Sequence, residues 1–261
     1  CWLTSTRSIW SAWSGHQHEH AMNTVRSLAF LLVSLAVMLV AGFLCLPLLV
    51  LAPSAAARVT RWIAGCQIAL LRQIVGLDLE MRWLQSLPET PVLIAAKHQS
   101  ALETYALTAL LPNACFVLKR EIVRVPVAGW YVRSLGVVAV DRAGGSSALK
   151  DMVRQAQEAV AVGRHIVIFP EGTRTKPGES VRYHPGVAAL YGALDIPVVP
   201  VALNTGLFWP RKRLTKRPGK AVIAFLEPIA PGMARKAFME ALSDRIESGT
   251  NRLIGETNSV E

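Results

Sequence analysis

The chain of 261 residues is long enough for one medium-sized domain with an appendage. Its net charge of +10 favours an anionic partner, such as an acidic lipid surface, a phosphorylated substrate or a nucleic acid. Its four cysteines, at positions 1, 45, 66 and 115, have no paired spacing, which excludes a zinc ribbon and a disulfide framework.

The first 21 residues carry no recognisable structural pattern. They begin with Cys1 and show no apolar periodicity, whereas Met22 starts a more natural sequence. We therefore expect residues 1–21 to be a disordered or artificial extension. His16, His18 and His20 alternate in this segment, and we expect them to be exposed and to form no metal site.

An uncharged segment of 31 residues runs from Ser27 to Ala57. As one helix it would be about 46 Å long, against roughly 30 Å of bilayer hydrocarbon. Pro47 and Pro53 should break it and leave about 20 residues before the first break, which is typical of a membrane span. A signal peptide is the alternative, but its apolar region would be only about 7–15 residues long. We expect a retained helical membrane anchor, either spanning the bilayer or re-entering it.

Residues 57–76 have apolar side chains near helical spacing, with Arg58, Arg61 and Arg72 among them. The pattern predicts a helix at the membrane interface whose arginines reach the headgroups, or an amphipathic helix packed on the domain. Basic residues after the anchor favour a catalytic domain on the cytoplasmic side. We assign residues 22–87 to the anchor and interfacial helix, and residues 88–261 to one catalytic domain.

After residue 88, short apolar segments alternate with helical patterns. The expected strands are Val92–Ala96, Ala114–Leu118, Gly136–Val140, His165–Phe169, Val198–Leu203 and Ala221–Leu226. The expected helices are Ala101–Leu111, Ser147–Val162, Val187–Leu194 and Ala234–Leu253. This alternation predicts an α/β fold with a mixed, largely parallel sheet flanked by helices.

The first candidate site follows the strand that ends at Ala96. His98 lies in the strand-to-helix turn, where open α/β sheets bind their ligands. If the helix starts at Ser100, His98 lies outside it, and the imidazole can meet the carboxylate of Glu103. Ser100 and Glu103 also form an S-x-x-E capping box, which explains Glu103 without catalysis. Both interpretations can hold together, because a carboxylate has several acceptor positions.

Two further segments carry charged side chains after strands. In "HIVIFPEGTRT" a buried strand leads into Glu171, Gly172, Thr173 and Arg174. Glycine allows close backbone approach and arginine donates to phosphate or carboxylate, so this turn indicates an anion site. Lys119 ends an earlier strand, and Asp141 with Arg142 is expected to form a structural ion pair.

Together these segments resemble the glycerophospholipid acyltransferases, in particular bacterial 1-acyl-sn-glycerol-3-phosphate acyltransferases. The family's histidine, four residues and acid are present as His98 to Glu103, and its glycine-threonine-arginine block as residues 169–174. "KREIVRVPVAGWYVRSLG" and "IPVVPVALNTG" look like its second and fourth blocks, so the resemblance covers residues 90–206 in the family's order. Two positions depart from the family: Glu103 replaces the usual aspartate, and Lys97 stands where asparagine is common.

The resemblance implies acyl transfer from acyl-CoA or acyl-carrier protein to the sn-2 hydroxyl of 1-acyl-sn-glycerol-3-phosphate, giving phosphatidic acid. It implies that His98 is the general base, oriented by Glu103, since an imidazole titrates near neutral pH and such a base contributes about 10²–10⁴-fold. It also implies a phosphate site made of Arg174 and Lys119, shaped by Glu171, Gly172 and Thr173. It implies no metal and no tightly bound cofactor.

Rival interpretations concern the acceptor and the class of protein. The acceptor can instead be glycerol-3-phosphate or another lyso-lipid, such as a lyso-ornithine lipid. A non-catalytic lipid-phosphate binding protein is a different class, in which His98 and Glu103 only cap a helix. The uncharged anchor and the lack of an aromatic and basic stripe argue against nucleic acid. The expected location is the bacterial inner (cytoplasmic) membrane, with lysophosphatidic acid, an acyl thioester, membrane lipids and acyl-carrier protein as partners.

Overall fold

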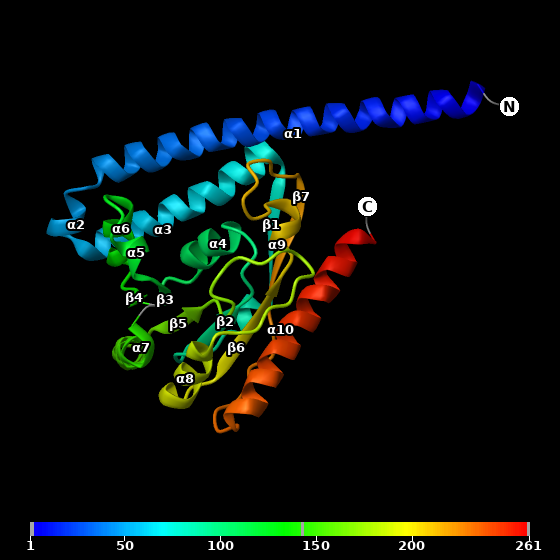
Figure 1. The fold of residues 1–261 in the computed structure, drawn as a ribbon. Coiled ribbons are helices and arrows are strands. Elements are labelled where there is room, and N and C mark those ends of the chain that lie inside the picture. The colour runs from blue at the N-terminus through cyan, green and yellow to red at the C-terminus, as the bar shows by residue number, and fades with distance from the viewer. Residues whose placement is uncertain (1–2, 142–143, 260–261) are drawn as a thin grey trace.

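A seven-stranded sheet forms the centre of the computed structural model, which describes residues 3–141 and 144–259 without the side chains of residues 3–19, 53 and 86. The strand order is β1-β7-β6-β2-β5-β3-β4 (Figure 1), and only the β6–β7 pair is antiparallel. This confirms the expected mixed, largely parallel sheet. The strands are β1 (Leu77–Arg82), β2 (Leu93–Ala96), β3 (Ala114–Lys119), β4 (Val138–Val140), β5 (His165–Ile168), β6 (Val198–Leu203) and β7 (Gly219–Phe225).

Strand β1 is the strand that the sequence analysis missed. It pairs in parallel with β7 along its whole length, from Leu77 beside Gly219 to Arg82 beside Ala224. Its sequence, LDLEMR, alternates apolar and charged residues, which is typical of an edge strand with one covered face. We expected these residues to belong to the anchor segment. The sheet therefore begins at Leu77, before the expected domain boundary at residue 88.

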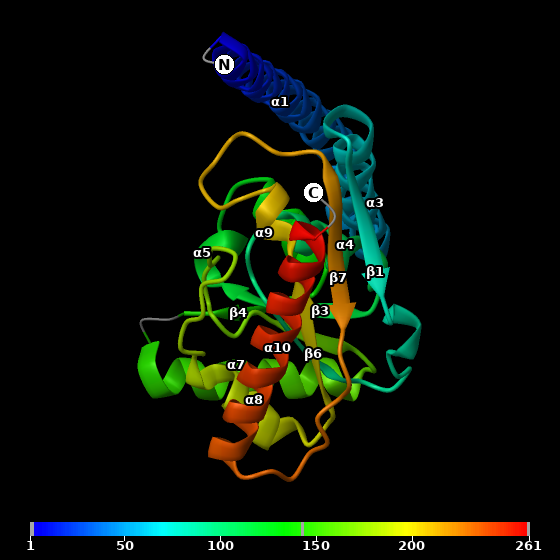
Figure 2. The same cartoon turned by 90° about the vertical axis from the view of Figure 1, so that its right-hand side faces the viewer.

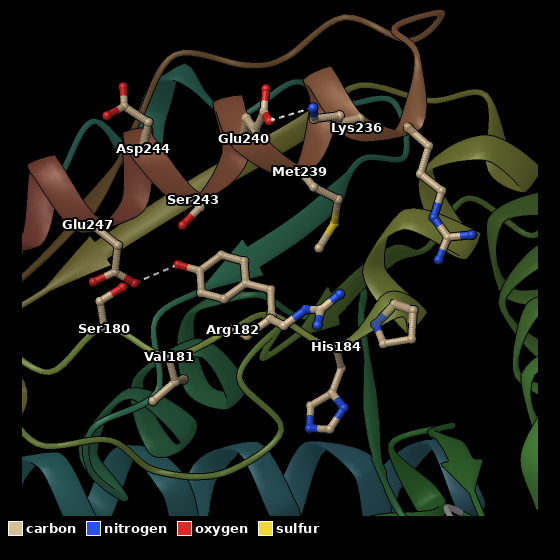
Figure 3. A pocket seen from close by; sticks show the side chains of 13 residues that line it. Ser180, Val181, Arg182, His184, Lys236, Met239, Glu240, Ser243, Asp244 and Glu247 are labelled. Carbon is tan, nitrogen blue, oxygen red and sulfur yellow. Dashed lines mark hydrogen bonds and ion pairs between the residues drawn. The ribbon is translucent and has the colours of Figure 1, made fainter.

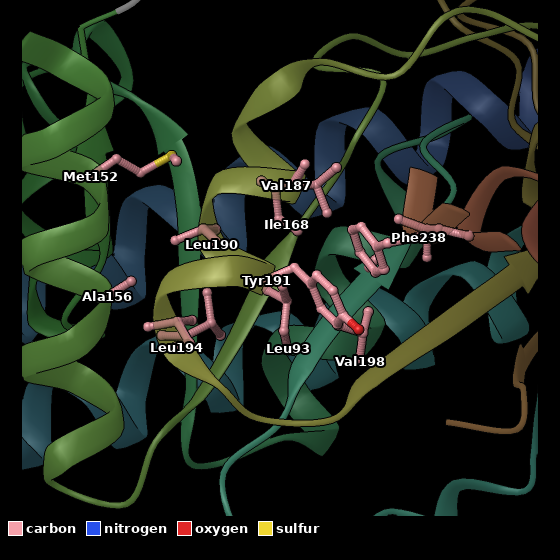
Figure 4. Packing of buried hydrophobic residues seen from close by; sticks show 14 of the residues in the cluster. Leu93, Met152, Ala156, Ile168, Val187, Leu190, Tyr191, Leu194, Val198 and Phe238 are labelled. Atoms are coloured by element: carbon pink, nitrogen blue, oxygen red, sulfur yellow. The ribbon is translucent and has the colours of Figure 1, made fainter. Parts of the chain in front are cut away.

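The two faces of the sheet pack against different helices. In β2, Leu93 and Ala95 enter one hydrophobic layer, while Ile94 and Ala96 enter the other, as the period of a strand requires. The first layer is shown in Figure 4 and includes Tyr191, whose ring stacks on a phenylalanine of the last helix. Its helices are α7 (Gly145–Ala161), α8 (Pro185–Leu194) and α10 (Arg235–Asn258), and α10 crosses in front of β6 in Figure 2. The second layer is covered by α4 (Leu102–Leu110) and α3 (Pro53–Leu70).

The N-terminal region forms a helical hairpin along the second layer. Helix α1 (Leu3–Leu44) is followed by α2 (Leu48–Leu51), and α3 then returns beside α1 in the opposite direction (Figure 1). The breaks fall at Pro47 and Pro53, as expected. Residues 3–21 belong to α1, in place of the disorder that we expected. Part of α1, His20–Leu44, is long and apolar enough to cross a membrane by length and composition. The proposed histidine cluster includes His16 and His18, which lie outside the described side chains.

Helix α3 packs on the domain through a face that includes small and polar residues. Its buried side chains include Ala56, Ala64 and Gln67, whereas Trp62 is 59% exposed. Arg61 donates to the Pro112 carbonyl at 3.4 Å. The helix therefore packs on the domain through one face and leaves a partly apolar face outward.

Three short helices were not expected from the sequence. They are α5 (Arg120–Val123), α6 (Ala128–Ser134) and α9 (Thr205–Phe208). Lys119 directly precedes α5, Pro126 lies two residues before α6, and Asn204 directly precedes α9. Gly129 allows α6 to approach α5, because a Cβ at this position would lie 2.5 Å from the Val123 carbonyl oxygen. The π-helical segment Leu71–Val75 and the 3-10 segment Leu84–Ser86 flank β1.

Candidate active site

Four neighbouring strands bring the candidate residues to one edge of the sheet. Strands β6, β2, β5 and β3 are consecutive in the sheet and parallel, so their carboxyl ends lie on the same side. His98 follows β2, the 169–175 turn follows β5, Thr205 follows β6, and Lys119 ends β3. Ligands of open α/β sheets bind at this edge. The topology therefore gathers residues that are more than a hundred positions apart in the sequence.

The expected meeting of His98 and Glu103 is present in the structure. Helix α4 begins at Leu102, so His98 lies before it and folds back over its first turn. The His98 Nδ1 atom lies 2.9 Å from Glu103 Oε1. The Glu103 side chain is fully buried, while the His98 side chain is 16% exposed. The ring is thus held by a buried carboxylate and keeps one edge open to solvent.

The surroundings of Glu103 define which ring nitrogen carries the proton. Oε1 accepts hydrogen bonds from the backbone nitrogens of Gln99 at 2.8 Å and Ser100 at 2.6 Å. Oε2 accepts a hydrogen bond from the hydroxyl of Thr205 at 2.8 Å. A carboxylate surrounded by donors acts as an acceptor only, so Nδ1 of His98 donates to it. Nε2 is then the basic nitrogen of the ring, and no protein hydrogen bond reaches it from the described residues.

The capping box is formed in part, alongside the contact with His98. Glu103 reaches back to the backbone nitrogen of Ser100, as the motif predicts. The Ser100 hydroxyl accepts instead from the backbone nitrogen of Leu102, at 3.2 Å. Glu103 therefore both caps α4 and orients the imidazole, and the two interpretations of this residue hold together.

The turn after β5 fixes both the ring and the backbone of His98. The Phe169 ring stacks on the imidazole with a centroid distance of 4.1 Å. The backbone nitrogen of His98 donates to Glu171 Oε2 at 2.6 Å, and its carbonyl accepts from the backbone nitrogen of Thr175 at 2.8 Å. The turn of residues 169–175 thus fixes the turn that contains His98.

Glu171 has a different place from the one that we expected. Its side chain is fully buried, with Oε1 2.9 Å from Lys97 Nζ and also bonded to the Thr175 hydroxyl at 2.9 Å. Burial raises the pKa of Glu171, and the Lys97 ammonium opposes that rise. Because its carboxylate faces inward, Glu171 supports the His98 turn. Its expected part in shaping a phosphate site stays a prediction.

Lys97, which had no explanation from the sequence, is the cation of this buried cluster. Its side chain is fully excluded from solvent. Besides Glu171, its ammonium contacts both carboxylate oxygens of Glu247, at 2.7 Å and 2.8 Å. A buried lysine is tolerated where it is paired and hydrogen-bonded, and this pairing is complete. Lys97 therefore belongs to the support of the His98 turn.

The residues expected at the phosphate differ in their exposure to solvent. Arg174 is half-buried, Thr173 is exposed, and Gly172 has a φ of 64°, which glycine adopts without strain. The Arg174 charge opposes the increase in pKa that burial causes at Tyr105, a residue of α4. Lys119 is exposed, and no hydrogen bond or ion pair joins it to Arg174 within the described part of the chain.

Several residues of the site escaped the sequence analysis. Thr205 bonds Glu103, and the backbone nitrogen of Gly206 donates to Gln99 Oε1 at 3.1 Å. Arg211 donates to the backbone carbonyl of Arg174 at 2.7 Å. Thr205 and Gly206 belong to the sequence "NTG", which ends the segment that resembles the fourth block of the family. That resemblance was the signal that could have identified them. Asp141 pairs with Arg120 at 3.4 Å, and Arg142 lies outside the described residues.

Metal ligation has no visible basis in the described ranges. Among the side chains that the structure describes, those of residues 20–52, 54–85, 87–141 and 144–259, no group of three or more His, Cys, Asp or Glu could hold a metal ion.

Comparisons with known proteins agree with this arrangement. The family model described as Acyltransferase matches residues 78–204. The 1-acyl-sn-glycerol-3-phosphate acyltransferase of Pseudomonas aeruginosa is 34% identical over 199 residues, which are 75% of this chain and 77% of that protein. The yeast (Saccharomyces cerevisiae) enzyme of the same description is 28% identical over 175 residues, 65% of this chain and 58% of that protein. The crystal structure of the 1-acyl-sn-glycerophosphate acyltransferase PlsC from Thermotoga maritima has the same fold, with a TM-score of 0.73 at 21% identity over 90% of this chain and 97% of that one.

Proposed function

The chain belongs to the glycerophospholipid acyltransferase family, and from this membership and the geometry at His98 we propose that it acylates the sn-2 hydroxyl of 1-acyl-sn-glycerol-3-phosphate. The product is phosphatidic acid, and the acyl donor is a thioester of CoA or of acyl-carrier protein. The observation that carries the proposal is the 2.9 Å contact between His98 Nδ1 and Glu103, which leaves Nε2 available to a substrate.

The proposed reaction uses a hydroxyl of the substrate as nucleophile. His98 Nε2 takes the proton from the acceptor hydroxyl, whose oxygen attacks the thioester carbonyl and forms a tetrahedral intermediate. Collapse of the intermediate breaks the carbon–sulfur bond, and the departing thiolate receives the proton from His98. Glu103 keeps Nδ1 protonated and stabilises the imidazolium between the two steps. No tightly bound cofactor takes part in this scheme.

Arg174 is the proposed main contact of the acceptor phosphate. Its guanidinium can bind a phosphate with two parallel hydrogen bonds, and its place after β5 puts it on the same edge of the sheet as His98. Lys119 adds a second positive charge at the end of β3. Gly172 and Thr173 shape the turn that carries Arg174. This site favours an acceptor with a phosphate over a lyso-lipid without one.

The proposed location is a membrane surface. Exposed apolar side chains, among them Leu32, Leu39 and Phe43, cover the outward side of α1. A lipid acceptor that stays in the bilayer avoids exposing its acyl chain to water, which would cost about 0.8 kcal/mol per methylene. The inner membrane, with the domain on its cytoplasmic side, agrees with Arg58, Arg61 and Arg72 after the anchor.

A basic loop, residues 211–220, supports the same orientation. Lys216 lies in this loop, and its ammonium stands 4.9 Å from the ring centroid of Phe30 on α1 and 4.6 Å from that of Trp209. The backbone nitrogen of Lys216 also donates to the Ser27 hydroxyl at 2.7 Å. The loop is thus attached at the polar end of the apolar part of α1, where its exposed residues Arg211, Lys212, Arg213 and Arg217 can reach anionic headgroups.

An assay of the full chain in detergent tests the proposal. Lysophosphatidic acid and glycerol-3-phosphate are each paired with acyl-CoA and acyl-carrier protein, and the products are identified by mass spectrometry. We expect phosphatidic acid from lysophosphatidic acid. Acylation of glycerol-3-phosphate alone would replace the acceptor, and binding of lysophosphatidic acid without thioester consumption would favour a non-catalytic lipid-phosphate binding protein.

A further inference from the structure

A buried polar cluster contacts the backbone of the His98 turn through Glu171. Lys97 Nζ contacts Glu171 Oε1 at 2.9 Å and Glu247 Oε1 at 2.7 Å, and it donates to the Glu179 carbonyl at 3.0 Å. The hydroxyl of Tyr183 donates to Glu247 Oε1 at 2.8 Å. Residues from the turn after β5, from α10 and from the segment before α8 therefore surround the ammonium group of Lys97, which directly follows β2.

The cluster is connected directly to the backbone of His98. Glu171 uses one oxygen for Lys97 and the other for the backbone nitrogen of His98, at 2.6 Å. The position of the Glu171 carboxylate thus sets the position of the His98 peptide. Without Lys97, the buried carboxylate would lose its only cationic partner among the described residues.

The balance of charge makes Lys97 the critical member. One ammonium faces the two carboxylates of Glu171 and Glu247, and the hydroxyl of Tyr183 donates to the second of them. Removal of the ammonium would leave two buried carboxylates close together, which is strongly unfavourable. Removal of the Glu247 charge alone would leave a neutral pair of Lys97 and Glu171. The variant at Lys97 should therefore have the larger effect.

Glu247 lies on α10, after the segment that matches the family model, residues 78–204. Its side chain is 17% exposed and borders a cavity of about 1110 Å³ between α10 and residues 180–185. Figure 3 shows Glu247 and Ser243 projecting from α10 toward this cavity. Tyr183 also lines the cavity, and its hydroxyl donates to Glu247. The C-terminal helix thus contributes to the support of the His98 turn from outside the segment that matches the family model.

We propose that Lys97 and Glu247 are positioning residues for the acyl transfer described above, a role that rests on the proposed function. Glu247 holds the Lys97 ammonium, Lys97 holds the Glu171 carboxylate, and Glu171 holds the His98 peptide so that the imidazole meets both Glu103 and the acceptor hydroxyl. Neither residue touches the substrate. Lys97 stands at the position where the family commonly has an asparagine before the histidine.

Three variants of the full chain test this chain of contacts: Lys97→Gln, Glu247→Gln and the double variant. Lys97→Gln should lower kcat about 10- to 100-fold with little change in either KM, because a displacement of about 1 Å at a catalytic group costs roughly 100-fold. Glu247→Gln should lower kcat less, by about 3- to 10-fold on the same basis. In the double variant, the glutamine at position 247 should cause no further loss, because Glu247 acts through Lys97.

A matched control and a second measurement separate positioning from loss of folding. Lys236→Gln removes an exposed lysine of α10 beside the same cavity and should leave kcat within about twofold. Thermal unfolding shows that each variant is folded at the assay temperature. The rate at which diethyl pyrocarbonate modifies His98, followed by peptide mass spectrometry, should rise in Lys97→Gln because the ring is no longer fixed.

The outcomes distinguish this inference from the proposed function. A folded Lys97→Gln variant with unchanged kcat and unchanged His98 modification would overturn the positioning role. Independent, multiplicative losses in the double variant would overturn the action of Glu247 through Lys97. If the unmodified chain transfers no acyl group, the proposed function fails, while faster modification of His98 in Lys97→Gln would still support positioning.

Discussion

The hydroxyl of Thr205 donates a hydrogen bond of 2.8 Å to Oε2 of Glu103, although 102 positions separate the two residues. This bond leaves Oε1 free to face the imidazole of His98 and the first turn of α4. It also connects the turn after β6 to the turn after β2. Each oxygen of the buried carboxylate therefore has defined donors, and the orientation of His98 depends on both.

Replacement of His98 by alanine should abolish acyl transfer. A general base contributes about 10²–10⁴-fold, so turnover of the thioester should fall by at least that factor. Thermal unfolding of the variant is measured alongside, to show that it is folded at the assay temperature. His184→Ala, at an exposed histidine away from the contact with Glu103, is the control. Normal turnover in His98→Ala would remove His98 from the role of base.

Glu103→Gln should reduce both activity and stability. An amide cannot accept all the hydrogen bonds that reach the carboxylate, and each buried donor left unpaired costs about 1–3 kcal/mol. Loss of the charge that stabilises the imidazolium should lower kcat by roughly 10²–10⁴-fold. Glu103→Asp keeps the charge and should retain more activity. Equal kcat in the glutamine and aspartate variants would show that the charge is not used.

Arg174→Ala should raise the KM for lysophosphatidic acid and leave the KM for the acyl donor unchanged. A hydrogen bond to a charged group contributes about 1.5–3 kcal/mol, which corresponds to roughly a 10- to 100-fold change. Arg154→Ala is the control, because Arg154 is an exposed arginine of α7 in a surface ion pair. Initial rates at varied acceptor concentration provide the measurement. If the two substrates are affected equally, Arg174 does not bind the acceptor phosphate.

The stability of the protein should depend on pH through Glu171. Burial raises the pKa of this carboxyl above the ordinary value of 4.5, so the folded state binds its proton more tightly than the unfolded state. The contribution of Glu171 to the free energy of unfolding is fully present below pH 4.5, and it is lost as the pH rises through the pKa of Glu171 in the folded state. Unfolding of the wild type and of Glu171→Gln is compared from pH 4.5 upward. The variant should gain relative stability with increasing pH, and a constant difference would contradict the raised pKa.

The basic loop should strengthen binding to anionic membranes. Each basic residue near such a surface contributes about 1 kcal/mol, so replacement of Lys212 and Arg213 by serine should weaken binding to vesicles that contain phosphatidylglycerol roughly 30-fold. Binding to neutral phosphatidylcholine vesicles should not change. Lys236→Ser provides a control on an exposed lysine of α10. Flotation of the full chain at limiting lipid and low salt measures the effect, and equal binding by both serine variants would exclude this contact.

The local part of the site could be predicted from the sequence. His98 follows an apolar strand and precedes a helix with a capping motif, so its turn and its neighbour Glu103 are defined within a few residues. The alternation of apolar segments predicts six of the strands for the same reason. Strand β1 was not predicted because it is short, alternates apolar and charged residues, and directly follows a long apolar region. The sequence could not indicate that β7 would pair with it.

The partners of buried charges were decided only by the tertiary structure. Nothing near Lys97 in the sequence indicates Glu247, which lies 150 positions away, and nothing near Glu171 indicates that its buried carboxylate pairs with Lys97. Local propensity and spacing determine turns and helix starts, because the interacting groups are neighbours along the chain. A buried ion pair depends on which strands and helices become neighbours in space, and the folding of the whole sheet decides that.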